Sequence, residues 1–272
     1  MEIGRTLSFP FREPSWLRRT AVGALLELFP LLVVGPALLA ALRHPARHTF
    51  PVTTIVLGAV AGLGTRWITL GYFRRVALGV FRGDTAGLPA WDRFDEDVLE
   101  GIKLWLLSLG VFLPAAGLTA AMAFLLVALG APWAAWLPVV VVLPVAAVAT
   151  LFFLPAALLA SIAEGELAAA FDVARLSRRI GRAAGPYLLA FLLAVAAEIV
   201  AQTGLLLMCA GIFATRFLAH CMAVHAFASA YHEGRSDAPE TPTAAAEPPR
   251  VPLLPADDGG QAAVFRGETT AE

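Results

Sequence analysis

The chain has 272 residues, of which 58% are hydrophobic and 15% are charged, and its formal net charge is −1. Soluble domains have about 45–50% apolar and about 25% charged residues, so this composition argues against an ordinary soluble fold. The near-zero net charge gives no overall field for nucleic acid, which we exclude as a partner. The two cysteines, Cys209 and Cys221, lie in apolar stretches and give neither a disulfide framework nor a metal-binding spacing.

The longest uncharged segment, Leu104 to Ala163, contains no Asp, Glu, Lys, Arg or His. As one helix it would be about three times longer than the roughly 30 Å hydrocarbon core, whereas two crossings and a turn suit its length. The apolar runs lack the alternation of barrel strands, and lipid requires each backbone group to be paired within its own segment. We therefore predict an all-α integral membrane bundle.

Six crossings are predicted in chain order, separated by polar segments. The first apolar run exceeds the roughly 7–15 residues of a signal-peptide core, so we expect it to remain as a crossing. Gly130-Ala131-Pro132 marks one of the turns. The predicted crossings are residues 20–42, 52–73, 104–129, 133–163, 186–208 and 212–231, within a transmembrane domain of residues 20–232.

Positive charges give the orientation of these crossings. Sixteen of the 20 Lys and Arg residues lie before the first crossing, after the second, after the fourth or after the sixth. Cytoplasmic segments carry such an excess, so we predict a multi-pass inner-membrane protein with both termini in the cytoplasm. Residues 1–19 form the cytoplasmic N-terminal segment. Residues 233–272 are rich in proline and acidic side chains and are predicted to be a disordered tail.

Two polar segments, residues 89–103 and 165–184, are predicted to be amphipathic helices at the cytoplasmic surface. Tryptophans at both ends of the first suit the headgroup level. Two interpretations of its acidic face are a metal site and a solvated surface. We favour the solvated surface, because the glycine that a calcium-binding loop requires at its sixth position is missing. The second carries a basic stripe that favours anionic lipid headgroups, with a specific phosphate-bearing ligand as the alternative. The stripe consists of Arg175, Arg178, Arg179 and Arg182.

A glutamate and an arginine lie inside the first two predicted crossings. A charge at the centre of a membrane helix costs about 2.5–3.5 kcal/mol and needs a partner or a cavity. Glu27 and Arg66 lie roughly 10 and 12 Å from the cytoplasmic ends of consecutive antiparallel helices. Because these depths match, we predict an intramembrane ion pair between the two side chains.

A second polar group lies in the last two predicted crossings. Glu198 and His220 lie at matching depths, roughly 18 and 17 Å, and Gln202 is one turn beyond Glu198. We predict that these three side chains form a cluster, with His225 nearer the cytoplasm. Helix packing through hydrogen bonds is one interpretation of the cluster, and a proton or ion route is the other.

Several short elements carry a family resemblance, most specifically Leu88-Pro89-x-Trp91-Asp92. The other elements are Phe9-Pro-Phe11 with Trp16, Gly71-Tyr72 with Arg74-Arg75, Gly101-x-Lys103, Gly211-Ile212-Phe213-x-Thr215, and His225 to Tyr231. With these elements the chain resembles a bacterial and archaeal family of polytopic membrane proteins catalogued as domain of unknown function 4013. The resemblance covers about residues 6–232. It implies a helical membrane architecture and brings no activity with it.

The sequence contains none of the common serine-hydrolase, zinc-protease or phosphate-loop motifs, so we predict no catalytic residue, metal or cofactor. The first function hypothesis is a non-enzymatic scaffold or accessory module in the cell envelope, with lipid and a possible membrane protein as partners. The second is a transporter or channel for a small solute, ion or lipid that uses the intramembrane polar residues. An intramembrane enzyme acting on lipids is the third. A polar cavity around these residues favours transport, and a dry interior favours the scaffold.

Overall fold

The computed structural model describes residues 3–43, 52–84, 87–134, 136–206 and 211–236, which form helices and turns with no strand among them. The predicted all-α class is confirmed. The α-helices are α1 (Ile3–Ser8), α2 (Trp16–Arg43), α3 (Val52–Phe81), α4 (Phe94–Ala128), α5 (Leu137–Glu164), α6 (Val173–Arg182), α7 (Ala184–Gln202) and α8 (Gly211–Ser236). The 3-10 helices are η1 (Phe9–Arg12), η3 (Pro132–Ala134), η4 (Leu167–Phe171) and η5 (Thr203–Leu206).

Five of the described helices are long and apolar enough to cross a membrane. They are α3 from Thr53, α4, α5 together with η3, α7, and α8 as far as Arg235. The helix α2, which contains the predicted first crossing, is not one of the five, so that crossing stays a prediction. The predicted tail begins inside α8, which continues to Ser236. Its remaining part, residues 237–272, lies outside the described residues.

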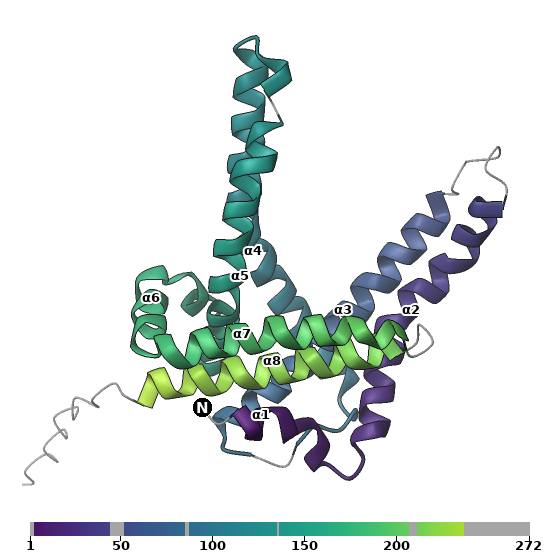
Figure 1. Cartoon of the computed structure of the whole chain (residues 1–272), viewed down its shortest axis with the longest axis vertical. Coiled ribbons are helices and arrows are strands. Elements are labelled where there is room, and N and C mark those ends of the chain that lie inside the picture. Colours follow the sequence, from purple (N-terminus) through teal and green to yellow (C-terminus); the bar gives the residue numbers. More distant parts are fainter. Residues whose placement is uncertain (1–2, 44–51, 85–86, 135, 207–210, 237–272) are drawn as a thin grey trace, which may run out of the picture. The chain divides into compact units, whose positions relative to one another are not determined.

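Consecutive helices pair as hairpins, namely α2 with α3, α4 with α5, and α7 with α8 (Figure 1). The helix α8 also contacts α2, α3, α5 and α6, so most of the long helices gather around it. Ala226, Ala228 and Ala230 are all fully buried, and they lie on different sides of the helix. Small residues let neighbouring helix backbones approach closely, which explains why α8 accommodates so many neighbours.

Two clusters of buried apolar side chains join the helices. The first lies around α5, α7 and α8 and combines many alanines with Tyr187 and Phe227. The second connects the N-terminal segment to α3 and α8 through Phe9, Tyr72 and Phe217. The N-terminal segment before α2 is therefore part of the packed structure.

The helix boundaries differ from the predicted segments, most clearly at the two predicted surface helices. The first predicted surface helix begins only at Phe94 and runs without a break into α4, so it and the third crossing form one helix of 35 residues. The second is divided, because Gly165 ends α5 with a left-handed φ of 73° and η4 follows before α6 begins. The linker of residues 209–211 between the fifth and sixth predicted crossings lies largely outside the described residues.

Candidate functional site

The loop that joins α3 to α4 is fastened to α2 and α3 by hydrogen bonds. The Trp91 indole N–H donates to the Arg19 carbonyl oxygen at 2.8 Å, and the Tyr72 hydroxyl donates to the Pro89 carbonyl oxygen at 3.0 Å. The Tyr72 and Trp91 rings stack with their centroids 4.0 Å apart. Leu88 is buried, and its carbonyl oxygen accepts a hydrogen bond from the Arg19 guanidinium. The Leu88-Pro89-x-Trp91-Asp92 element therefore connects this loop to α2 and α3.

Arg75, on α3, binds acidic side chains from this loop and from α4. Its Nε and Nη2 donate to the two carboxylate oxygens of Asp97 at 2.9 and 2.6 Å, which is a bidentate pair. Its Nη1 donates to Asp92 Oδ1 at 2.9 Å and to the Ala90 carbonyl oxygen at 2.7 Å. Asp97 is only 2% exposed, so the expected solvated acidic face is wrong at this residue. We call Arg75 with Asp92 and Asp97 the Arg75 clamp.

Two glycines let α3 and α4 touch backbone to backbone at the Arg75 clamp. A Cβ atom at Gly71 would overlap the backbone of Asp97, and a Cβ atom at Gly101 would overlap the carbonyl oxygen of Trp67. Any side chain at either position would therefore force the helices apart. Both glycines belong to the sequence elements that carry the family resemblance, and this contact is their physical role.

A hollow of about 590 Å³ lies beside the Arg75 clamp, between the N-terminal segment, α3 and the following loop. Nine charged side chains line it, and many of them already have partners. Arg19 lies 2.9 Å from Glu13, and Arg93 lies 3.4 Å from Glu96. The lining charges are Glu13, Arg19, Arg74, Arg75, Arg82, Asp84, Asp92, Arg93 and Glu96. The lining thus combines five basic with four acidic side chains, so its charges nearly balance.

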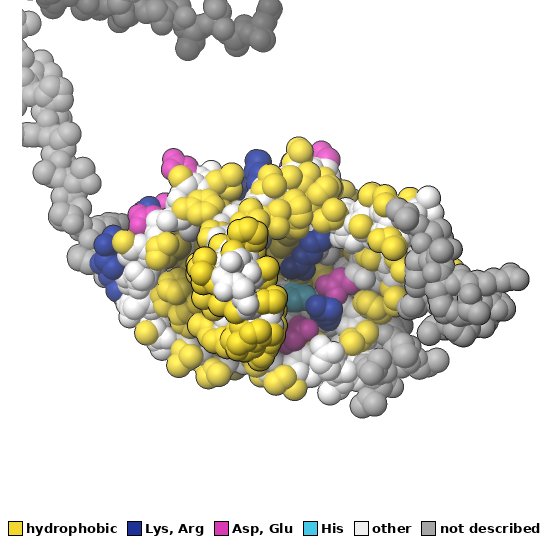
Figure 2. Space-filling view, turned by 90° about the horizontal axis from the view of Figure 1, so that it is seen from above, with side chains coloured by type: hydrophobic (Ala, Val, Ile, Leu, Met, Phe, Trp, Pro, Cys, Tyr) yellow, Lys and Arg dark blue, Asp and Glu magenta, His cyan; other side chains and the backbone are white. Residues whose placement is uncertain are grey.

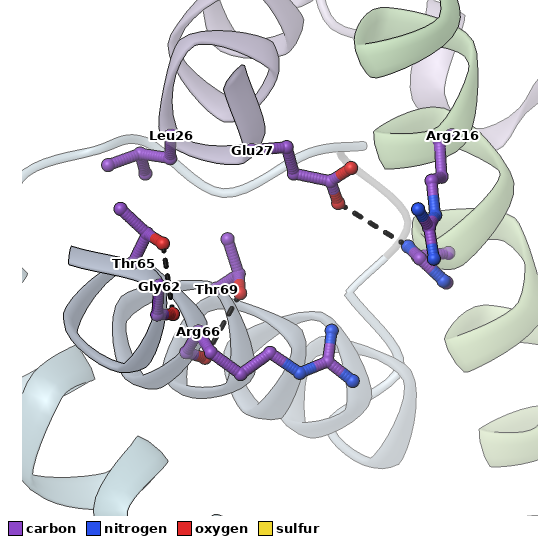
Figure 3. A pocket seen from close by; sticks show the side chains of 8 residues that line it. Leu26, Glu27, Gly62, Thr65, Arg66, Thr69 and Arg216 are labelled. Atoms are coloured by element: carbon purple, nitrogen blue, oxygen red, sulfur yellow. Dashed lines mark hydrogen bonds and ion pairs between the residues drawn. The ribbon is translucent and has the colours of Figure 1, made fainter. Parts of the chain in front are cut away.

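A smaller cavity of about 180 Å³ lies among α2, α3 and α8 (Figure 3). Viewed from above, basic, acidic and histidine side chains gather in a hollow that apolar surface surrounds (Figure 2). The residues that line the cavity are Leu26, Glu27, Gly62, Thr65, Arg66, Thr69, Arg216 and His220. We call it the charged cavity.

His220 lies between two carboxylates at the charged cavity. Its Nδ1 is 3.5 Å from Glu27 Oε1, and its Nε2 is 3.9 Å from Glu198 Oε2. Glu198 Oε1 also lies 3.6 Å from Arg216 Nε and accepts a hydrogen bond from the Gln202 amide at 3.2 Å. Polar contacts therefore link α2, α8 and α7 in one chain. They include the three residues that the sequence predicts to cluster between the last two crossings.

The predicted partners Glu27 and Arg66 line the same cavity, but no ion pair joins them directly in the part of the chain that the structure describes. The recorded partner of Glu27 is His220. Figure 3 shows the Arg66 side chain extending from α3 toward Arg216 on α8. The predicted direct ion pair is therefore absent among the described residues, although both side chains line the same cavity.

Arg216 is a cavity residue that the sequence reasoning missed, and His225 is a predicted one that lies elsewhere. Arg216 and His220 are four residues apart on α8, a spacing that puts both on one helix face and could have identified the arginine. The His225 ring instead packs against Phe9 at a centroid distance of 4.4 Å. Its buried Nδ1 has no hydrogen-bond partner among the described residues.

The basic stripe on α6 divides into two pairs of arginines. Arg175 and Arg179 bind the carboxylate of Glu164 at 2.7 and 2.8 Å, which ties α6 to the end of α5. Arg178 and Arg182 are exposed, and neither makes a recorded ion pair with another described residue. Two of the four arginines are therefore used within the fold, and the other two face outward.

Comparison with known families gives a match over part of the chain. A family model described as "Protein of unknown function (DUF4013)" matches residues 52–210, which include the Arg75 clamp and the residues Arg66 and Glu198. The lining residues of the charged cavity on α2 and α8 lie outside the matched range. No curated protein and no solved structure matches the chain. The match confirms the resemblance identified from the sequence.

Proposed function

The chain belongs to the family described as "Protein of unknown function (DUF4013)", and from this premise we propose that it binds a small charged or polar solute in the charged cavity and passes it across the inner membrane. The observation that carries the proposal is a cavity lined by Glu27, Arg66, Arg216 and His220. Two of the helices that form it, α3 and α8, are apolar enough to cross a membrane.

The energetics of charge in membranes support a binding role for this cavity. Charged side chains in membrane segments are rare, and those present face the bundle interior or a water-filled cavity and mark ion or substrate pathways. The side chains of Arg216 and Glu198 are 52% and 40% exposed, although they lie only 3.6 Å apart. Charges that served packing alone would be expected to be enclosed and fully paired, as Asp97 is in the Arg75 clamp.

Solute flux through reconstituted protein tests the proposal. The full chain is placed in liposomes, and uptake is measured for a panel of chloride, inorganic phosphate, acetate, potassium and glycerol. At least one solute should cross faster than in empty liposomes, and Glu27→Gln or Arg66→Gln should lower that rate by about tenfold or more. Arg82→Gln, which removes a charge outside the charged cavity, serves as the control. Absence of flux, or flux equal in all variants, overturns the proposal.

We also propose that both ends of the chain face the cytoplasm. Support comes from the distribution of positive charge, because 16 of the 20 Lys and Arg residues fall in segments that this orientation places inside. Reporter tags on the two termini should be inaccessible from outside intact cells. Detection of the two tags on opposite faces of the membrane contradicts this orientation.

The outward pair on α6, Arg178 and Arg182, is proposed to contact anionic lipid headgroups. Each basic residue near an anionic surface contributes about 1 kcal/mol. The double variant Arg178→Gln/Arg182→Gln should therefore retain less phosphatidylglycerol during purification than the wild type, as measured by lipid mass spectrometry. Arg175→Gln/Arg179→Gln is the matched comparison, because its arginines bind Glu164. Equal retention in wild type and outward-pair variant contradicts the assignment.

A scaffold or accessory module is the second candidate, and the α4–α5 hairpin favours it. Large apolar side chains are exposed along both helices, for example Phe124 at 74% and Val145 at 69%. Such a surface is covered either by lipid or by a membrane-protein partner. A photo-crosslinker at residue 124 should yield a protein adduct of constant mass in membranes if the scaffold hypothesis holds, and lipid adducts alone if it does not.

A further inference from the structure

We infer that Arg66 is the anion-binding group of the charged cavity and that the ligand presents a small oxyanion, a carboxylate or a phosphate, to it. The inference rests on the proposed function and narrows its solute to one chemical class. The oxyanion has two sources, a free small anion and the headgroup of a phospholipid, and the experiment below separates them.

The guanidinium of Arg66 is the unsatisfied cation of the cavity. Its side chain is exposed, and the structure records no ion pair or hydrogen bond for its guanidinium among the described residues. A guanidinium presents five N–H donors in a planar fork that matches the oxygens of a carboxylate or phosphate. In an apolar helix such a group requires an acceptor, either water or an anion.

Two glutamates lie near the guanidinium groups of the cavity, Glu27 on its wall and Glu198 beside Arg216. Glu27 lies 3.5 Å from the His220 ring, and Glu198 binds both Arg216 and the Gln202 amide. Neither carboxylate forms a recorded ion pair with Arg66 among the described residues, so the charge of Glu27 acts on Arg66 only at longer range. The N–H donors of the Arg66 guanidinium therefore have no recorded acceptor on the described cavity wall, and in our inference a bound oxyanion supplies it.

The threonine hydroxyls of the cavity are engaged as well. The Thr65 hydroxyl donates to the Ala61 and Gly62 carbonyl oxygens at 3.0 and 3.1 Å. The Thr69 hydroxyl donates to the carbonyl oxygen of Arg66 at 3.0 Å. Both protons are used within α3, so these threonines offer a ligand only weak further contact. The charge of Arg66 thus dominates recognition on this side of the cavity.

Arg216 adds a second positive charge that favours an anion. Arg216 lines the same cavity and repels the positive charge of Arg66, whereas Glu27 attracts the charge of Arg66. The contact of Arg216 with Glu198 is long, at 3.6 Å. An oxyanion placed between the two guanidiniums would replace this repulsion with attraction to both.

The volume limits the ligand to a small group. The cavity measures about 180 Å³, below the roughly 300–1,000 Å³ of drug-sized sites. At about 30 Å³ for each water molecule in the liquid, the space holds a few water-sized groups. Phosphate, a short carboxylate, or the phosphate of a lipid whose chains remain outside all suit this size.

Titration of inorganic phosphate into the full chain tests the inference. The protein is purified in a non-ionic detergent and studied by calorimetry at constant pH and ionic strength. We expect saturable binding by the wild type, at least about tenfold weaker binding by Arg66→Gln, and an intermediate loss for Arg66→Lys, which keeps the charge without the fork. Arg82→Gln is the matched control and should bind within about twofold of the wild type.

Native mass spectrometry with added phosphatidylglycerol separates the two sources. If the ligand is a headgroup, the wild type retains the lipid, Arg66→Gln loses it, and phosphate displaces it. If the ligand is a free anion, phosphate binds and the lipid does not compete. Should Arg66→Gln fail to fold, Arg216→Gln replaces it, and several-fold weaker phosphate binding is expected.

Unchanged phosphate binding and lipid retention in Arg66→Gln overturn the inference, and so does the absence of both from the wild type. The proposed function fails independently. If phosphate binds but no solute crosses, Arg66 is an anion site in a protein that does not transport. If potassium crosses but no anion binds, the transport function holds and the oxyanion inference fails.

Discussion

Two arginines on the same helix, Arg66 and Arg75, have opposite surroundings. Arg75 donates to both oxygens of the buried Asp97, to Asp92 and to a backbone carbonyl. Arg66 extends into the charged cavity, and its guanidinium has no recorded ion pair or hydrogen bond within the described ranges. An arginine whose donors are satisfied by the fold stabilises that fold, whereas one whose donors remain open is available to a ligand.

The largest expected effect on stability is that of Arg75→Gln. The substitution leaves the carboxylate of Asp97 buried without its cation, and breaking a buried pair in this way costs about 3–5 kcal/mol. Equilibrium unfolding in mixed micelles with increasing denaturing detergent, followed by helicity, measures the loss. A decrease of less than about 1 kcal/mol would mean that the Arg75 clamp is not what holds α3 to α4.

Gly101→Ala is expected to have an intermediate effect. The added Cβ meets the Trp67 backbone, and overpacking of this kind costs about 1–3 kcal/mol. Gly64→Ala is the matched control, because nothing lies within 4 Å of the Cβ it would add. That control should cause no loss and should raise the free energy of unfolding by up to about 1 kcal/mol, since alanine favours a helix over glycine by about that amount. Equal losses in both variants would contradict the close contact of α3 and α4.

The smallest expected effect on stability is that of Arg66→Gln, which should change the free energy of unfolding by less than about 1 kcal/mol. The reason is that the guanidinium satisfies no recorded acceptor of the fold. The same unfolding assay measures it. A loss as large as that of Arg75→Gln would show that Arg66 serves the structure, and the contrast between the two arginines would disappear.

The relative level of side chains on neighbouring helices can be estimated from the sequence. A rise of 1.5 Å per residue placed Glu198 and His220 at matching levels, and the structure finds them in contact. Rotation about the helix axis is harder to predict, because it depends on how α2, α3 and α8 pack. For this reason the sequence predicts Arg66 as the partner of Glu27, whereas the recorded partner, His220, comes from α8.

The sequence also could not predict that Asp97, a charged residue outside the apolar runs, is buried. The pattern around Asp97 is that of a surface helix, with carboxylates on one face. The sequence does not reveal that α3 continues to Phe81 and so brings Arg75 beside α4. Likewise the four arginines of α6 form one stripe by spacing, yet only tertiary structure assigns two of them to Glu164. A charge pattern predicts which residues share a helix face, whereas tertiary packing determines which residues contact that face.

The continuity of α4 restricts how the protein can move. Its 35 residues make a helix about 52 Å long, which is well beyond the roughly 30 Å thickness of a bilayer's hydrocarbon core. The Arg75 clamp grips the start of this helix through Asp97. Pro114, the proline inside α4, removes one backbone hydrogen bond and is the natural place for a bend. If the clamped end of α4 tilts, the helix should therefore move as one rigid segment from Phe94 to Pro114.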